Sequence, residues 1–226
     1  FSTWSFTLMP ESRAKLLCAY QNDAYSNDYL AFLDEIGGIL ASRGLGDCEA
    51  FLTEVARSLG RLMAYKDEYE VARLYSLPAF REGLEDQFAG NPKLKVHLAP
   101  PLLAFRKDAR TGRPRKIAFP GWLVFPLFRV LAGLKGLRGG ALDIFGYTAE
   151  RRMERALISE YKELVREVAD KVTRETMHAA VEVAASAELI AGYGPVKDAG
   201  VADFRMRIGE LLPKIAAGVE KVAEPA

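Results

Sequence analysis

Apolar residues recur at steps of three and four along most of the chain, which is the periodicity of amphipathic helices. The clearest case is a helix over residues 148–172, for which Thr148 provides an N-cap. Its apolar face consists of Met153, Leu157, Tyr161, Leu164 and Val168. The pattern predicts further helices over 11–36, 48–77, 80–88, 122–137 and 173–192, and a last one that starts near Val201 and breaks at Pro213.

The pattern changes between residues 94 and 119, where apolar and polar residues alternate as they do in strands. A turn-forming stretch at 108–112 separates the two alternating runs, so a β-hairpin is expected at about 94–119. The predicted fold is therefore mainly α, a bundle-like single domain with an inserted β-hairpin. We expect an irregular segment over 1–14, the helical domain with its hairpin over 15–212, and a frayed tail over 213–226.

Charged residues continue the apolar stripe of the expected helix over 48–77, because Lys66, Glu70 and Arg73 fall at the same steps. They form either a solvated helix face or a site or interface. In the second interpretation, a partly buried charge network joins this helix to the helix over 148–172, because Arg151 lies unfavourably at a positive helix end and needs a carboxylate. The candidate members are Lys66, Asp67, Glu70, Arg73, Arg151 and Arg155.

Composition excludes several classes of function. The chain has 31 basic and 30 acidic residues, so no overall field attracts nucleic acid or membrane. Cys18 and Cys48 form neither a disulfide framework nor a metal motif, and we expect them reduced and buried in a cytoplasmic protein. His97 and His178 lack ligands at suitable spacing. The sequence thus indicates no catalytic, cofactor-binding or metal-binding residue in this chain.

Two basic stretches remain open to interpretation. The glycine-rich loop over 133–140, with Lys135 and Arg138, is either a flexible connector or a weak anion site. The expected hairpin tip is either a solvated strand pair or a docking site for an acidic protein. Its basic residues are Arg106, Lys107, Arg110, Arg113, Arg115 and Lys116.

Five stretches resemble the C-terminal domain of the fused indolepyruvate:ferredoxin oxidoreductases, members of the 2-oxoacid oxidoreductase superfamily. They are LLCAYQNDAY (16–25), RLMAYKDEYEVARLY (61–75), KLKVHLAPPLLAFRKDARTGRPRK (93–116), LKGLRG (134–139) and FGYTAERRMERALISEY (145–161). The resemblance implies an accessory domain of an enzyme that converts aryl pyruvates to acyl-CoA and reduces ferredoxin.

The resemblance also implies cofactors and partners for the whole enzyme. Thiamine diphosphate, magnesium and four-iron four-sulfur clusters belong to other domains, because this chain has neither a GDG-type motif nor grouped cysteines. The implied partners are the other domains of the enzyme, ferredoxin, and further copies in a homo-oligomer. The chain begins with Phe1, and we expect a piece of a longer polypeptide. The alternative is a stand-alone helical interaction module without enzymatic activity.

If the basic hairpin docks an acidic electron carrier, reversing Arg113 and Arg115 to Glu in the full enzyme should slow ferredoxin reduction. The effect should be largest at low ionic strength, because exposed charges act mainly on the association rate. Stopped-flow reduction of ferredoxin at two salt concentrations measures it. An unchanged rate at low salt would leave the solvated strand pair.

Overall fold

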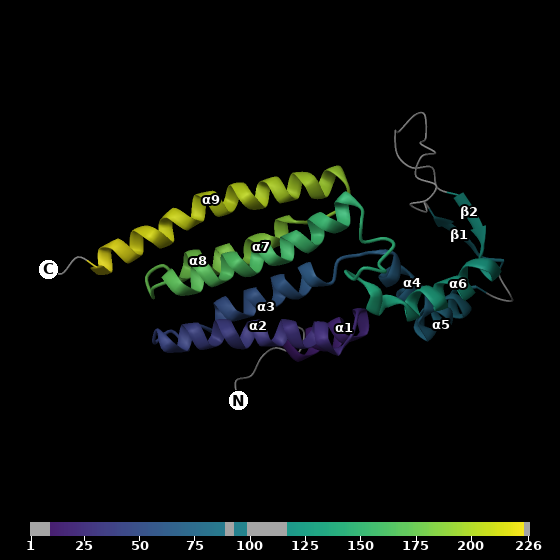
Figure 1. Cartoon of the computed structure of the whole chain (residues 1–226), viewed down its shortest axis with the longest axis horizontal. Helices are drawn as coiled ribbons and strands as arrows, with labels where there is room; N and C mark the ends of the chain where they lie inside the picture. Colours follow the sequence, from purple (N-terminus) through teal and green to yellow (C-terminus); the bar gives the residue numbers. More distant parts are fainter. Residues whose placement is uncertain (1–9, 89–92, 99–116, 224–226) are drawn as a thin grey trace. The chain divides into compact units, whose positions relative to one another are not determined.

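A computed structural model describes residues 10–88, 93–98 and 117–223. These residues are mainly α-helical and include one two-stranded antiparallel sheet, which confirms the predicted fold class (Figure 1). The chain separates into two compact units. Unit 1 comprises Phe1–Tyr65 and Ala149–Ala226, and unit 2 comprises Lys66–Thr148. The sequence pattern contained no linker that marked this division.

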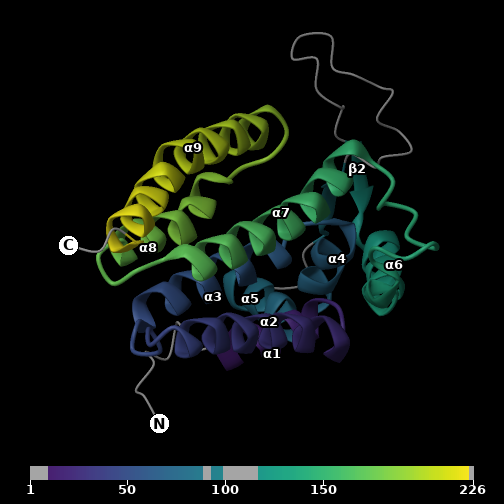
Figure 2. The same ribbon diagram turned by 60° about the vertical axis from the view of Figure 1, so that its left-hand side comes forward.

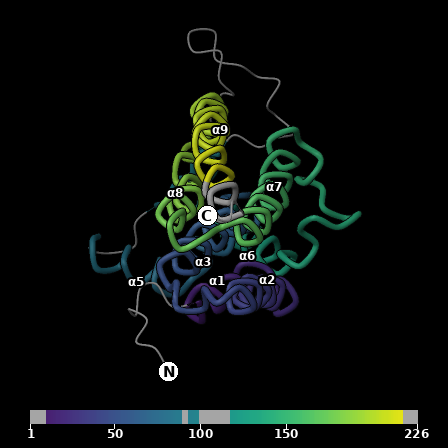
Figure 3. Tube along the Cα trace, turned by 90° about the vertical axis from the view of Figure 1, so that its left-hand side faces the viewer, coloured from purple at the N-terminus to yellow at the C-terminus, as the bar shows by residue number. Residues whose placement is uncertain are grey.

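Unit 1 is a bundle of helices from both ends of the chain. Its elements are α1 (Pro10–Tyr20), α2 (Asp23–Ser42), α3 (Glu49–Met63), α7 (Ala149–Lys171), α8 (Met177–Ala185), the 3-10 helix η3 (Ser186–Leu189) and α9 (Pro195–Ala223). Helix α3 packs against α2 on one side and against α7 and α8 on the other (Figure 2). Helix α9 covers α7 and α8, as the view in Figure 3 shows.

The core of unit 1 follows from the helical periodicity. Helix α3 buries Phe51, Val55, Leu59 and Met63, which lie four residues apart on one face. The expected apolar face of the 148–172 helix is confirmed in α7, where Leu157, Tyr161, Leu164 and Val168 are buried and Met153 is partly buried. Cys18 and Cys48 are free thiols, as expected, but both are only partly buried.

Three buried tyrosines tie main-chain segments of unit 1 together. The hydroxyl of Tyr29 donates to the carbonyl of Ala56 at 3.0 Å, and that of Tyr161 donates to the carbonyl of Ala184 at 2.8 Å. The hydroxyl of Tyr20 donates to the carbonyl of Tyr65 at 2.8 Å. Burial raises the pKa of both Tyr29 and Tyr161, so these hydroxyls remain protonated donors.

Unit 2 holds the hairpin and the helices around it. Its elements are α4 (Glu68–Ser76), α5 (Pro78–Gln87), β1 (Lys95–Leu98), β2 (Ile117–Pro120), α6 (Gly121–Gly133) and the 3-10 helix η2 (Lys135–Leu137). The two strands match the predicted hairpin and pair in antiparallel register, with Val96 opposite Phe119. Helix α6 packs on α4, and the small core centres on Ala72, Val124 and Phe128.

The expected continuous helix over 48–77 is wrong. Helix α3 ends at Met63, and α4 begins at Glu68 after a short break. The cause is Asp67, whose backbone is extended and whose side chain accepts a hydrogen bond from the Glu70 amide, as an N-cap does. Lys66 is exposed, so the apolar stripe does not continue through it.

Two expectations for the last helix are also wrong. Helix α9 starts at Pro195 rather than near Val201. Proline is well suited to the first helical position, because the backbone N–H that it lacks would have no acceptor within the helix there. The helix also continues through Pro213. Leu211 and Ile215 on either side of Pro213 are buried, and this packing holds the helix across the proline.

We predict that Pro213→Ala stabilises the protein by about 1–3 kcal/mol, because it restores a helical hydrogen bond and removes a clash at an exposed position. Thermal unfolding followed by circular dichroism measures the change. Pro195→Ala is the matched control, and it should be neutral or slightly destabilising. Equal shifts of both variants would contradict this explanation.

Candidate functional site

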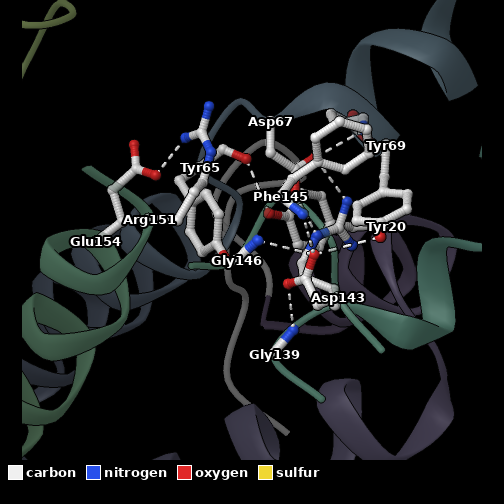
Figure 4. A network of polar contacts seen from close by, with 12 residues as sticks. Tyr20, Tyr65, Asp67, Tyr69, Gly139, Asp143, Phe145, Gly146, Arg151 and Glu154 are labelled. Carbon is white, nitrogen blue, oxygen red and sulfur yellow. Dashed lines mark hydrogen bonds and ion pairs between the residues drawn. The ribbon is translucent and has the colours of Figure 1, made fainter. Parts of the chain in front are cut away.

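The carboxylate of Asp67 is the centre of a buried polar network in unit 2 (Figure 4). Besides capping α4, it binds the Arg138 guanidinium through two contacts, Nε to Oδ2 at 2.5 Å and Nη2 to Oδ1 at 2.8 Å. The two side chains are only 3% and 2% exposed. Such a bidentate pair is strong and directional, so it fixes the loop that carries Arg138 against the start of α4.

Tyr69 extends this network to a second carboxylate. Its ring lies 5.4 Å from the Arg138 guanidinium, and its hydroxyl donates to Asp143 at 3.2 Å. Asp143 also accepts hydrogen bonds from the amides of Gly139, Phe145 and Gly146. Burial and then the Asp143 carboxylate raise the pKa of Tyr69 to about 12, so its hydroxyl stays protonated at neutral pH.

The glycine-rich loop over 133–140 therefore binds two carboxylates of the protein itself, those of Asp67 and Asp143. Arg138 is buried against Asp67, and the Gly139 amide donates to Asp143 at 2.8 Å. Gly139 has a φ of 75°, which glycine adopts without strain. Lys135 lies in η2 and is partly buried. The loop's polar groups thus stabilise the fold of unit 2.

Some other members of the predicted charge network form ion pairs along their own helices. Glu70 binds Arg73 at 2.7 Å, three residues along α4. Arg151 binds the carboxylate of Glu154 on the same helix (Figure 4). The Lys197 ammonium binds Glu154 as well. Arg155 is partly buried on α7. Arg151 thus binds a carboxylate on the next turn of its own helix.

Helix α6 exposes a row of apolar side chains. Leu123, Leu127, Val130 and Leu134 follow one another at steps of four, three and four, so they share one face, which we call the α6 stripe. Leu127 and Val130 are 61% and 62% exposed, whereas Val124 and Phe128 on the adjoining face are buried. A row of exposed apolar side chains is a feature of protein interaction sites.

A groove of about 1120 Å³ lies beside α6 in unit 2. Its apolar walls include Tyr75, Phe80 and Phe125, with the Tyr75 and Phe80 rings 4.7 Å apart. Its charged lining residues are the exposed Arg81, Lys93, Lys95 and Arg129, against Glu85. The groove thus offers an apolar floor and a positive rim, which suits an acidic partner.

The remaining expectations concern the hairpin tip, metal binding and membrane spans. The basic hairpin tip, from Arg106 to Lys116, lies outside the described residues. Among the described residues, no group of three or more His, Cys, Asp or Glu side chains could hold a metal ion. No helix in the described part of the chain has the length and apolar character needed to cross a membrane.

Sequence reasoning missed the Asp67–Arg138 pair and the role of Asp143. A signal for the capping role of Asp67 was present, because Asp67 and Glu70 have the spacing of an N-cap and its third helical residue. The pairing partner, 71 positions away, has no local signal. The α6 stripe had a signal in the sequence, because the helix predicted there carries apolar residues on more than one face.

The fold and the buried network define a mainly helical protein with an inserted antiparallel hairpin, in which buried ion pairs organise the loops. The chain belongs to a protein family of unknown function, DUF6537, which matches residues 9–210. No curated protein and no solved structure matches the chain.

We predict that Asp67→Ala destabilises unit 2 by about 3–5 kcal/mol, because it leaves Arg138 buried without its partner and removes the cap of α4. Hydrogen exchange of the α4 amides reports this locally. Glu70→Ala, in a more exposed pair, should have an effect of about 1 kcal/mol or less. Similar losses of hydrogen-exchange protection in both variants would show that the Asp67–Arg138 pair contributes no more to stability than the Glu70–Arg73 pair does.

Proposed function

We propose that this chain is an accessory, non-catalytic docking domain of a thiamine diphosphate-dependent indolepyruvate:ferredoxin oxidoreductase. In this proposal the reaction takes place in other domains, which hold the thiamine diphosphate, magnesium and four-iron four-sulfur clusters. The present domain contacts those domains within a cytoplasmic homo-oligomer, and its basic hairpin is available to ferredoxin. Neither nucleic acid nor membrane is among the proposed partners.

The positions of the resembling stretches support this proposal. The stretch over 61–75 contains Asp67 and Tyr69, and the stretch over 134–139 contains Arg138. They therefore include both members of the buried ion pair of unit 2. The stretches span much of the region, residues 9–210, that belongs to the DUF6537 family. A resemblance that includes fold-determining buried residues favours a shared domain rather than a chance local match.

The α6 stripe is the single observation that carries the docking role. Leu123 and Leu134 at its ends are 49% and 44% exposed, so the whole row is accessible in this chain. Its spacing suits a second helix, because residues at steps of three and four form the ridge that packs into the groove of a neighbour. The positive rim of the adjacent groove adds charge selectivity to such a contact.

A stand-alone interaction module is the competing proposal, because the α6 stripe would serve an unrelated partner equally well. The reading frame around this chain distinguishes the two. A GDG-type thiamine motif and grouped cysteines in the same polypeptide or operon favour the enzyme, whereas their absence favours the module.

We predict that the double change Leu127→Gln and Val130→Gln weakens docking by at least about tenfold, because two apolar side chains lose their burial in the complex. The dissociation constant is measured between this chain and the remainder of the parent polypeptide, expressed separately.

Met206→Gln on α9 is the matched control, since Met206 is also 62% exposed but lies in unit 1. It should leave docking unchanged, and neither variant should alter the thermal midpoint of the isolated chain. Equal weakening by both variants, or no complex at all, would count against the proposed docking surface.

A further inference from the structure

A second hollow, of about 380 Å³, lies in unit 1 between α1, α3 and η3. Its volume is within the range of small-molecule sites in proteins. Leu16 of α1 and Ala64 at the end of α3 supply apolar lining. This pocket is formed by elements of unit 1 alone, and the docking role proposed for α6 does not depend on it.

The lining of this pocket carries an excess of positive charge. It contains Arg13, Arg57 and Arg61 but one carboxylate, that of Glu188. Arg57 uses that carboxylate and also binds Glu54, with Nε to Oε2 at 2.9 Å. Arg13 and Arg61 have no carboxylate partner within the described chain, so two guanidinium groups on one pocket remain uncompensated.

These two arginines also make few hydrogen bonds to the described part of the chain. Arg61 donates through Nη2 to the Ile190 carbonyl at 3.2 Å, and a guanidinium has five N–H donors in total. The Nε of Arg13 is buried and has no acceptor within the described chain. A buried donor without an acceptor is unfavourable, and a bound anion would satisfy it.

Gly60 makes room for Arg13. A Cβ atom added at this position would lie 3.0 Å from Cδ of Arg13, which is closer than in nine of ten such contacts. Glycine within a helix is unfavourable by about 1 kcal/mol relative to alanine, so its presence in α3 needs a reason. Here it lets the aliphatic part of Arg13 pack directly against α3.

We propose that this pocket binds the oxyanion group of a small molecule, a carboxylate or a phosphate, between Arg13 and Arg61. Guanidinium groups bind both kinds of oxyanion through paired hydrogen bonds. Leu16 and Ala64 contact the apolar part of the ligand. Ser58 also lines the pocket, and its buried hydroxyl has no hydrogen-bond partner within the described chain, so it is a further donor beside the two arginines.

Isothermal titration calorimetry of the whole chain tests this site with three probes: inorganic phosphate, butyrate and butyl phosphate, all at constant ionic strength in chloride. We expect saturable binding of one equivalent of at least one probe. Tighter binding of butyrate identifies a carboxylate ligand, and tighter binding of butyl phosphate identifies a phosphate ester. Arg13→Gln and Arg61→Gln should each weaken binding by at least about tenfold.

Arg205→Gln is the matched control, because Arg205 is an exposed arginine of unit 1 that binds Glu160 outside the pocket. It makes the same change in net charge and should leave the affinity unchanged. Without ligand, Arg13→Gln should leave the thermal midpoint unchanged or raise it, because it removes a buried donor that has no acceptor within the described chain. If Arg13→Gln fails to fold, Ala64→Leu narrows the pocket without changing its charge and should also weaken binding. The proposal is overturned if none of the probes saturates, or if Arg205→Gln weakens binding as much as Arg13→Gln.

Discussion

The buried carboxylate of Asp67 is the interaction on which the local structure of unit 2 depends. It caps the first turn of α4, and its ion pair with Arg138 holds the loop after α6. A buried charge is tolerated only when it is paired and hydrogen-bonded, so neither the cap nor the loop can change its position independently. Asp143 completes the arrangement, because its carboxylate accepts hydrogen bonds from the Tyr69 hydroxyl and from three backbone amides of the same loop.

This polar network explains how a unit with a small apolar core keeps α6 in place. Helix α6 contributes Val124 and Phe128 to that core and places them next to Ala72 of α4. The loop that follows α6 is fixed to α4 by the Asp67–Arg138 pair, so both ends of the contact are constrained. The α6 stripe is consequently presented on a rigid element, and a rigid apolar surface loses little conformational entropy when it binds a partner.

The sequence predicted those features that repeat locally. The apolar face of α7 and the alternating strands of the hairpin were found because each pattern covers several periods. The break between α3 and α4 was missed because Lys66, Glu70 and Arg73 continue the helical spacing across it, although Asp67 carries an N-cap signal. The Asp67–Arg138 pair could not be predicted, since a contact over 71 positions depends on tertiary structure. Pro213 shows the converse, because tertiary packing of its neighbours overrides a local helix breaker.

Both candidate sites lie where the sequence departs from what the fold alone requires. Alanine at position 60 would favour the α3 helix more than glycine does, and polar residues along the α6 stripe would suit an exposed helix face better than Leu127 and Val130. Natural sequences that break such local rules do so mainly at functional positions. The two departures also differ in chemistry, since one makes room for an uncompensated arginine and the other exposes apolar surface. A small anion and a protein surface are therefore the two kinds of ligand that these residues favour, one in each unit.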